Sequence, residues 1–258
     1  MPQSSREKNW SVFMKNPIGG NLLSFVFAST LLIASACKKE EGTKPVENVG
    51  KSTAVFNTTL TYGTVSDHQG NVYKTIKIGT QTWMAENLRS THYRNGDPIP
   101  NVKGTADWLS LTSGAFCTYK NSENKDSIAT FGRFYNWYAV NDSRKICPFG
   151  WHIPSQAEAA TLMTFLGSDA GKKLKEAGPD HWANNQGGSN SSGFTGLPTG
   201  LRSGENGTFF NLGGLTEFWL STEKDADKAW YRDLGNYDYS YEGAGSKKFG
   251  FCIRCLQD

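Results

Sequence analysis

The chain has 258 residues, of which 37% are hydrophobic, 20% are charged and 28 are glycine, and its formal net charge is +3. Eight Trp, ten Tyr and fifteen Phe, together with the glycines, favour a globular domain of turns and short strands over a helical bundle. Arg6, Lys8 and Lys15 against Glu7 supply two of the three positive charges, so the remainder is nearly neutral and gives no electrostatic reason to expect a nucleic-acid partner.

The apolar run from Leu22 to Ala36 is the first segment with a role that can be read from its composition. It is shorter than the roughly 20 residues of a membrane-spanning helix, but it matches the apolar core of a secretory signal, with Lys15 on its N-terminal side. Small residues then lead directly into Cys37, an order that resembles a bacterial lipobox. We therefore predict a lipoprotein signal over residues 1–36, with Met14 as an alternative start, and a lipid anchor on Cys37. An uncleaved anchor helix is the other interpretation.

Residues 37–63 combine the anchor with a polar linker. Such a composition cannot form a core, so the segment is expected to act as a tether. Its basic-then-acidic start, Lys38 to Glu41, resembles signals that direct some bacterial lipoproteins to the outer face of the outer membrane, although a solvated linker would look the same. We expect an outer membrane lipoprotein that is exposed at the cell surface and contacts the membrane through its lipid.

The rest of the chain, residues 64–258, is expected to form one domain. A turn at Asp67–Asn71 followed by alternation over Val72–Ile78 predicts an opening hairpin with Val72 on the inner face. The aromatic segment Phe134–Val140 fits a helix or a strand.

A helix start follows in the middle of the domain. Ser155 can cap a helix N-terminus while Glu158 reaches back to it, which is the capping-box pattern, and the helix is expected to continue to Leu166. Ser168 is a candidate cap for a second short helix that ends at Glu176.

Glycine, asparagine and serine then predict a long loop region over residues 180–215. Short strands are expected near 218–221, 229–234 and 249–256. The predicted fold class is therefore α+β, with short twisted antiparallel strands, two or three short helices and long loops.

Four cysteines remain after the anchor, and an even number in an exported chain favours two disulfides, for which three connectivities exist. They are Cys117, Cys147, Cys252 and Cys255. A redox-active pair at Cys252 and Cys255 is the alternative. These two lie in an alternating run typical of a strand, where residues three apart point to opposite faces, so structural disulfides with separate partners are preferred.

Eight sequence blocks in fixed order carry a resemblance to a known family. They occupy residues 70–75, 79–88, 132–139, 147–155, 192–194, 197–202, 218–223 and 253–255. The series resembles the Fibrobacter succinogenes major paralogous domain, a family of exported bacterial proteins without a settled biochemical role, from about Val65 to Asp258. The resemblance implies a Cys147–Cys255 disulfide. It also suggests an additional bond from Cys252 to Cys117, because the family more often has a small polar residue at the position of Cys252.

More distantly, the Cys147–Trp151 block, the capped helix and the terminal cysteine-bearing strand look like the C-type lectin-like fold. The formylglycine-generating enzymes share that architecture, which would imply a hairpin, two helices, a long loop region and a returning strand. Fold analogy alone does not transfer function, so each site is considered separately.

Metal ligands are sparse in this sequence. The four histidines are scattered without zinc spacing, and the triplets typical of calcium-dependent lectins do not occur. Four aspartates could supply hard oxygen ligands, although the first two resemble a solvated turn between lysines: Asp225, Asp227, Asp233 and Asp238. We expect no cofactor, with calcium as the alternative.

Catalytic signatures are also missing, since the sequence has neither a Gly-x-Ser-x-Gly elbow nor a phosphate-binding loop. Aromatic side chains beside polar ones suit stacking on sugar rings, and the preferred surface candidates are Trp182, Tyr237, Tyr239 and Tyr241. We therefore predict a non-catalytic binding module for glycan or a surface protein. A secreted enzyme of the formylglycine-generating type, which needs paired copper-binding thiols, and a structural envelope component are the alternatives.

Overall fold

The computed structural model describes residues 50–183 and 187–258, which belong to one compact unit. The predicted signal, the Cys37 anchor and residues 38–49 of the predicted linker lie outside the described residues. Residues 50–63 of that linker pack on the domain, with Phe56, Leu60 and Tyr62 against the core, so the predicted tether extends too far. Within the described ranges, no helix has the length and apolar character needed to cross a bilayer. The mixture of strands and helices confirms the predicted α+β class.

The first sheet joins the N-terminal hairpin to the C-terminal strand, and all its neighbours are antiparallel. Its strands, in spatial order, are β1 (Gly63–Ser66), β2 (Val72–Ile78), β3 (Gln81–Met84), β12 (Leu256–Gln257) and β6 (Trp151–His152). The predicted hairpin is therefore confirmed. Its turn is closed by the Asp67 carboxylate, which accepts the backbone N–H groups of Gln69 and Asn71. Val72 is 45% exposed and Tyr73 is buried, so the predicted inner position of Val72 is wrong.

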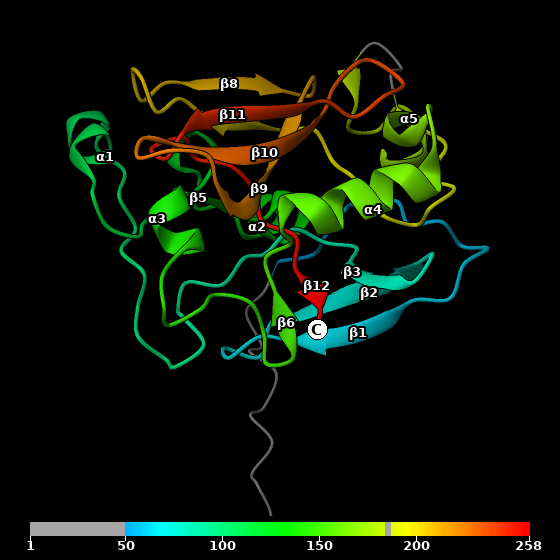
Figure 1. The fold of residues 1–258 in the computed structure, drawn as a ribbon, viewed down its shortest axis with the longest axis horizontal. Helices are drawn as coiled ribbons and strands as arrows, with labels where there is room; N and C mark the ends of the chain where they lie inside the picture. Colours follow the sequence, from blue (N-terminus) through cyan, green and yellow to red (C-terminus); the bar gives the residue numbers. More distant parts are fainter. Residues whose placement is uncertain (1–49, 184–186) are drawn as a thin grey trace, which may run out of the picture. The chain divides into compact units, whose positions relative to one another are not determined.

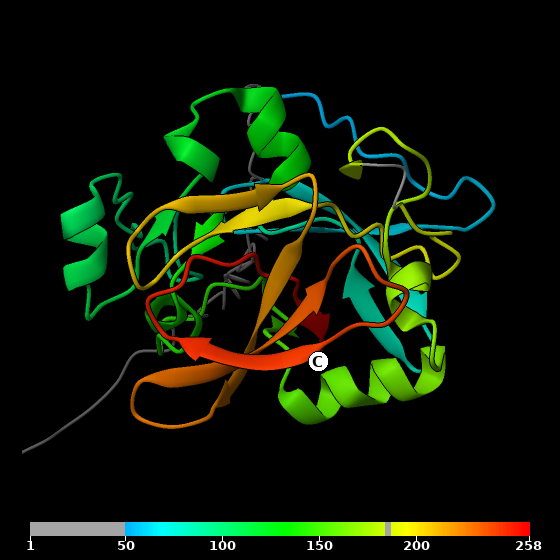
Figure 2. The same cartoon turned by 90° about the horizontal axis from the view of Figure 1, so that it is seen from above.

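The second sheet lies at the top of the domain in Figure 1 and is seen from above in Figure 2. Its strands, in spatial order, are β11 (Glu242–Ser246), β10 (Lys228–Leu234), β9 (Thr216–Glu223), β7 (Thr199–Arg202) and β8 (Phe209–Leu212). Only β7 and β9 pair in parallel. The strands predicted near 218–221 and 229–234 are confirmed by β9 and β10. The loop predicted over 180–215 is wrong where β7 and β8 form a hairpin. Both strands are only four residues long, with Gly200 inside β7 and Gly213 directly after β8, so their sequences resemble a loop.

The helices are short and lie around the sheets. They are α1 (Thr105–Ser110), η1 (Tyr119–Asn121), α2 (Lys125–Phe131), α3 (Trp137–Val140), α4 (Gln156–Leu166) and α5 (Ala170–Leu174). Ser155 and Glu158 form the predicted capping box of α4. The second predicted helix starts after Asp169 and ends earlier than expected, because Lys175 is extended and bridges to Gly196. The aromatic segment divides into α3 and a strand of the small sheet formed by β4 (Phe116–Cys117) and β5 (Phe134–Tyr135).

Helix α4 packs between the two large sheets, as Figure 1 shows. One buried cluster joins Trp83 of the first sheet, Leu162 of α4 and Phe218 of the second sheet. A second cluster contains Tyr135, Trp219 and other aromatic residues on the face of β9 that points away from α4. The second sheet is therefore covered by apolar residues on both faces over part of its area.

Two arginines from the sequence blocks fasten loops to this core. Buried Arg254 donates to Asn87 Oδ1 at 2.6 Å and to carbonyl groups of β3 and of residues 194–195. Fully buried Arg202 donates to the carbonyl groups of residues 102–104 at 2.7–3.1 Å. Charge-assisted hydrogen bonds satisfy both buried cations. The presence of these two arginines in the sequence blocks is therefore explained by a structural role rather than by function.

Candidate functional site

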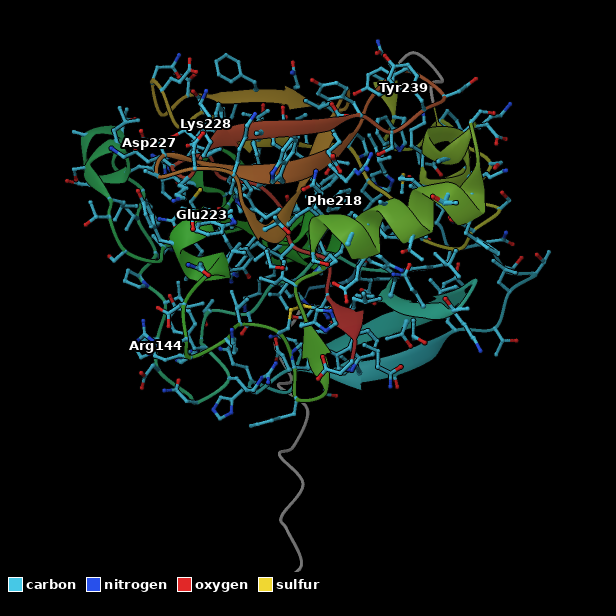
Figure 3. The ribbon with its side chains drawn as sticks, viewed as in Figure 1. Arg144, Phe218, Glu223, Asp227, Lys228 and Tyr239 are labelled. Carbon is cyan, nitrogen blue, oxygen red and sulfur yellow. A yellow bond between two sulfur atoms is a disulfide. The ribbon has the colours of Figure 1, made fainter. Side chains whose placement is uncertain are left out.

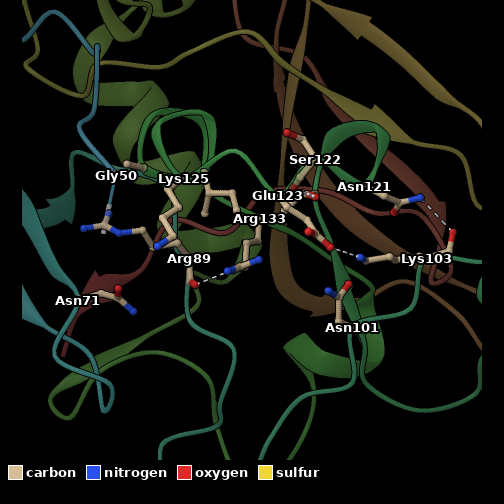
Figure 4. Close-up of a pocket in the computed structure, with 13 residues that line it drawn as sticks. Gly50, Asn71, Arg89, Asn101, Lys103, Asn121, Ser122, Glu123, Lys125 and Arg133 are labelled. Atoms are coloured by element: carbon tan, nitrogen blue, oxygen red, sulfur yellow. Dashed lines mark hydrogen bonds and ion pairs between the residues drawn. The ribbon is translucent and has the colours of Figure 1, made fainter. Parts of the chain in front are cut away.

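A hollow of about 320 Å³ lies beside α2 and is the strongest candidate for a ligand site (Figure 4). It is lined by the turn before β2, the chain after β3, the loop before α1, η1 and α2. We name it the cationic pocket, because four of its lining side chains are basic and one is acidic. They are Arg89, Lys103, Lys125 and Arg133, with Glu123.

Arg133 is positioned by the backbone of Arg89, and both arginines lie over aromatic rings. Nε of Arg133 donates to the Arg89 carbonyl oxygen at 2.9 Å, the contact drawn between them in Figure 4. The Arg133 guanidinium lies 4.8 Å from the centre of the Phe116 ring, and that of Arg89 lies 4.3 Å from the Tyr73 ring. Ring faces attract guanidinium groups and hold them in place. The terminal nitrogens of Arg133 make no further hydrogen bond within the described residues, so its planar fork remains available.

Arg89 adds positive charge to the wall rather than an open donor. It is buried, and its Nη2 donates to the Val72 carbonyl oxygen at 2.6 Å. Its nearest carboxylate is Glu86, 3.5 Å from Nη1, while Nε and Nη1 have no hydrogen-bond partner in the described chain. A weakly compensated buried cation makes the adjacent space favourable for an anion.

Lys103 lies on the opposite wall, and its backbone is held by hydrogen bonds from two side chains. Its carbonyl oxygen accepts from Arg202 at 3.0 Å and from Asn121 at 3.2 Å. Its ammonium group pairs with Glu123 at 2.5 Å, and this hydrogen bond lowers the pKa of the Glu123 carboxyl. Both side chains are well exposed, so water and salt screen the pair and an incoming anion can compete with Glu123.

Neutral hydrogen-bonding groups complete the lining. Asn71, Asn101, Asn121 and Ser122 offer amide and hydroxyl groups next to the basic side chains. This set can bind a negatively charged polar ligand and orient its hydroxyl groups. Gly50 also lines the pocket, packed against the first turn of α2, so the chain enters the described domain at the pocket rim.

Trp182, predicted to be a surface aromatic, is wrong as a surface candidate. Its side chain is 1% exposed, and its indole N–H donates to the Gly196 carbonyl oxygen at 3.1 Å. The Lys175 ammonium lies 5.2 Å from the ring centre. Trp182 therefore belongs to the core beneath the loop region, where long-range contacts cover it.

The three candidate tyrosines do lie together in the loop between β10 and β11. Tyr239 and Tyr241 are 55% and 53% exposed, and the half-buried Tyr237 stacks on Tyr239 with 4.4 Å between ring centres. Figure 3 shows Tyr239 at the edge of the domain. This loop does not line the cationic pocket. Sugar stacking on these tyrosines stays a prediction.

The four calcium candidates are not brought together. Asp225 accepts the backbone N–H groups of Asp227 and Lys228 in the tight turn before β10, as expected for a solvated turn. Asp233 and Asp238 follow at the other end of that strand, about 20 Å away for a seven-residue strand. Figure 3 shows the turn and the tyrosine loop at opposite ends of the sheet. In the part of the chain that the structure describes, no three His, Cys, Asp or Glu side chains gather to hold a metal.

The cysteines form one of the two expected disulfides. Cys147 bonds to Cys255, the pair that the family resemblance implied. Cys117 and Cys252 are buried free thiols, so the expected second disulfide is absent from this structure. The Cys252 thiol faces Thr199 Oγ1 at 3.3 Å and Asn87 Nδ2 at 3.5 Å. Burial raises the pKa of both thiols to about 12, which keeps them protonated and unreactive.

Sequence reasoning missed the pocket residues. Arg89 directly follows one sequence block and Arg133 lies inside another. The blocks therefore drew attention to this part of the sequence, but they did not predict that the two arginines contact each other. They are 44 positions apart, and the contact between them depends on how α2 and β5 return to the chain after β3.

Comparison with known proteins adds one positive finding. Residues 76–257 match the sequence profile of the Fibrobacter succinogenes major domain, which covers more than half of the chain. Neither a curated protein nor a solved structure matches the sequence.

Proposed function

The chain belongs to the Fibrobacter succinogenes major domain family, and we propose that this member is an exported, lipid-anchored binding module that recognises an acidic glycan in the cationic pocket. The main support for this proposal is the charge of that pocket, which is lined by four basic side chains and one carboxylate. A uronic acid or a sulfated sugar supplies the complementary negative charge on a ring that also carries hydroxyl groups.

The pocket chemistry favours a sugar acid over a bare ion. The planar fork of Arg133 suits bidentate contact with a carboxylate or sulfate, and Lys103 adds a mobile point charge. Asn101, Asn121 and Ser122 would then hydrogen-bond the ring hydroxyl groups. A volume of about 320 Å³ is at the small end of ligand sites and suits one or two sugar units.

The proposed anchor supports the same ligand class. Twelve residues separate Cys37 from Gly50 at the pocket rim, a tether of at most about 40 Å. A lipid on Cys37 therefore keeps the pocket close to the surface on which the protein sits. Acidic polysaccharides of that surface, or of neighbouring cells, would be within reach.

We also propose that the domain has a C-type lectin-like fold. Supporting this, the last strand β12 lies beside the N-terminal hairpin in one sheet, and the Cys147–Cys255 bond joins the chain before β6 to the chain before β12. An experimental structure, compared with that fold group, tests the proposal.

The binding experiment uses the full chain in a polyoxyethylene detergent, which carries neither sugar nor charge. Calorimetric titration with methyl glucuronide, and with a uronate oligosaccharide, is compared with the neutral glucoside. We expect the acid to bind at least about tenfold more tightly, and the affinity to fall with added salt.

Matched variants locate the site. Lys103→Gln should weaken uronate binding, whereas Lys228→Gln, which removes an exposed lysine outside the pocket, should not. Equal binding of acid and neutral sugar, or equal loss in both variants, would contradict the proposal.

A further inference from the structure

A second charged region lies on the second sheet, on the face that points away from α4. Glu217 of β9 is directly opposite Asp233 of β10, and Trp219 is opposite Tyr231. Alternate residues of a strand share a face, so these four side chains lie on one side of the sheet. The intervening Phe218 takes the other side, where it packs with Leu162 of α4.

The two carboxylates have no cationic partner. Glu217 is 7% exposed and Asp233 is 8% exposed, and neither makes an ion pair within the described residues. Oε2 of Glu217 is buried without any hydrogen-bond partner there. Arg232, the nearest arginine in sequence, instead pairs with Glu242 at 2.7 Å. Like charges opposite each other on neighbouring strands destabilise a sheet, and burial adds to the cost. Without a ligand Glu217 therefore holds a proton near neutral pH, which a bound cation would displace.

Tyrosine side chains surround the carboxylates. The Asp233 carboxyl accepts the Tyr241 N–H at 3.1 Å, and the nearby Tyr237 hydroxyl acts to lower the pKa of that carboxyl. The Tyr231 ring lies against Gly243 of β11, where any Cβ would overlap the ring. Burial, followed by the charges of Glu217 and Asp233, raises the pKa of Tyr231 to about 12, as expected for a hydroxyl close to both carboxyl groups.

We name Glu217, Asp233, Tyr231 and Tyr237 the acidic–tyrosine cluster. Calcium is a poor match for it, because calcium needs six to eight oxygen ligands and no third acidic, histidine or cysteine side chain joins the cluster among the described residues. Aromatic rings with carboxylates suit an organic cation, which the ring faces attract as well. Glu217 and Asp233 are only 7% and 8% exposed, so a slim head group on a flexible stem would reach them more readily than a sugar ring.

We propose that the acidic–tyrosine cluster binds the primary ammonium group of a lysine side chain presented by a protein partner. The alkyl stem would lie along the tyrosine rings, while the ammonium group donates to Glu217 and Asp233. The exposed Tyr239 and Tyr241 then form a rim for the partner's backbone. This site is separate from the cationic pocket and does not depend on the acidic-glycan proposal.

The test uses the full chain in the same neutral detergent, with Nα-acetyl-lysine methylamide as the probe and NMR chemical shifts as the readout. Saturable shifts of resonances from the tyrosine loop and β10 are expected. The probe acetylated also at Nε, which keeps the stem and loses the charge, should bind at least about tenfold more weakly.

Variants of similar shape separate this site from general attraction to acidic protein. Glu217→Gln should lower probe affinity at least about tenfold, whereas Asp227→Asn, at the exposed turn before β10, should leave it unchanged. Near-UV circular dichroism establishes that Glu217→Gln remains folded.

Three results would overturn the proposal. These are equal binding of the two probes, unchanged affinity in folded Glu217→Gln, and preference for glucosamine over the lysine probe, which would assign the cluster to amino sugars. Calcium-induced shifts of the same resonances that compete with the probe would assign it to a metal. None of these results affects uronate binding at the cationic pocket.

Discussion

Arg254 and Arg133 both come from sequence blocks of the family, yet the fold surrounds their guanidinium groups differently. Arg254 is buried among four acceptors, three of them backbone carbonyl oxygens. Arg133 is partly exposed and makes one hydrogen bond, to the Arg89 carbonyl oxygen. Glu217 is an acidic counterpart of the second kind, buried but without a partner for Oε2. Charges that the fold satisfies maintain structure, while charges that it leaves unsatisfied are available to a ligand.

The largest effect on stability is expected for Arg254, whose guanidinium group is fully hydrogen-bonded within the fold. Arg254→Met should lower the free energy of unfolding by about 3–5 kcal/mol, because it leaves buried acceptors of β3, Asn87 and residues 194–195 without their donor. Urea denaturation measures the change. Arg254→Lys, which retains the charge without the fork, should recover part of the loss. A decrease in the free energy of unfolding below about 1 kcal/mol would show that the hydrogen bonds of Arg254 contribute little to stability.

Substitution of Glu217 should have the opposite effect, an increase in stability at high pH. Burial, then the Asp233 charge, raises the pKa of Glu217 from 4.5 to about 8, so the folded state holds a proton that the unfolded state releases. Stability is therefore fully kept below about pH 4.5 and is lost progressively as the pH rises through about 8. The expected loss from pH 5 to pH 8 is on the order of 3 kcal/mol.

Glu217→Gln should remove most of this slope and make the protein more stable than wild type at pH 8. Denaturation curves at several pH values measure it, with Asp227→Asn as an exposed control that keeps the slope. Parallel pH profiles for wild type and Glu217→Gln would mean that the carboxylate is neutralised by a partner or is more solvated than its burial indicates.

A smaller effect is expected where a buried carboxylate does have a partner. Glu176 accepts from His181 at 2.7 Å and from the Val55 backbone at 2.6 Å, so it holds the incoming chain on the domain. The hydrogen bond with Glu176 raises the pKa of His181 above 6.5. Its contribution is fully present below about pH 6.5 and is lost as the pH rises through the raised value.

His181→Ala should therefore cost about 1–3 kcal/mol at pH 6 and less at pH 9. Thr53 also loses a 2.9 Å contact with the ring, so limited proteolysis near residues 51–56 should accelerate. His68→Ala, at an exposed histidine, is the control. A cost that is the same at both pH values would exclude the charged form of His181 from the interaction.

The distinction between local and long-range contacts explains how much of the fold the sequence could predict. The hairpin turn at Asp67 and the capping box at Ser155 depend on contacts within four residues, so their patterns were sufficient. Trp182 looked like a surface aromatic because its cover comes from Gly196 and Lys175, which no local pattern shows. The short β7–β8 hairpin was hidden by glycine and polar residues that also suit a loop.

The candidate sites were harder to predict, because each depends on distant or register-dependent neighbours. The cationic pocket needs Arg89 and Arg133 to meet across 44 positions. The acidic–tyrosine cluster needs the register that sets Glu217 against Asp233, and a one-residue slip would move one of them to the other face. The exposed tyrosines were predictable as a group, while the carboxylates beneath them were not.

Arg133→Gln should have the smallest effect on stability and a large effect on binding. Only one backbone hydrogen bond and the contact with Phe116 are lost, so the free energy of unfolding should fall by about 1 kcal/mol or less. Affinity for the uronate oligosaccharide should fall at least about tenfold, because the bidentate fork is removed. Urea denaturation and calorimetric titration on the same preparation measure both. A loss of several kcal/mol with unchanged affinity would place Arg133 with Arg254, as part of the structure, and would leave the pocket without its principal anion-binding group.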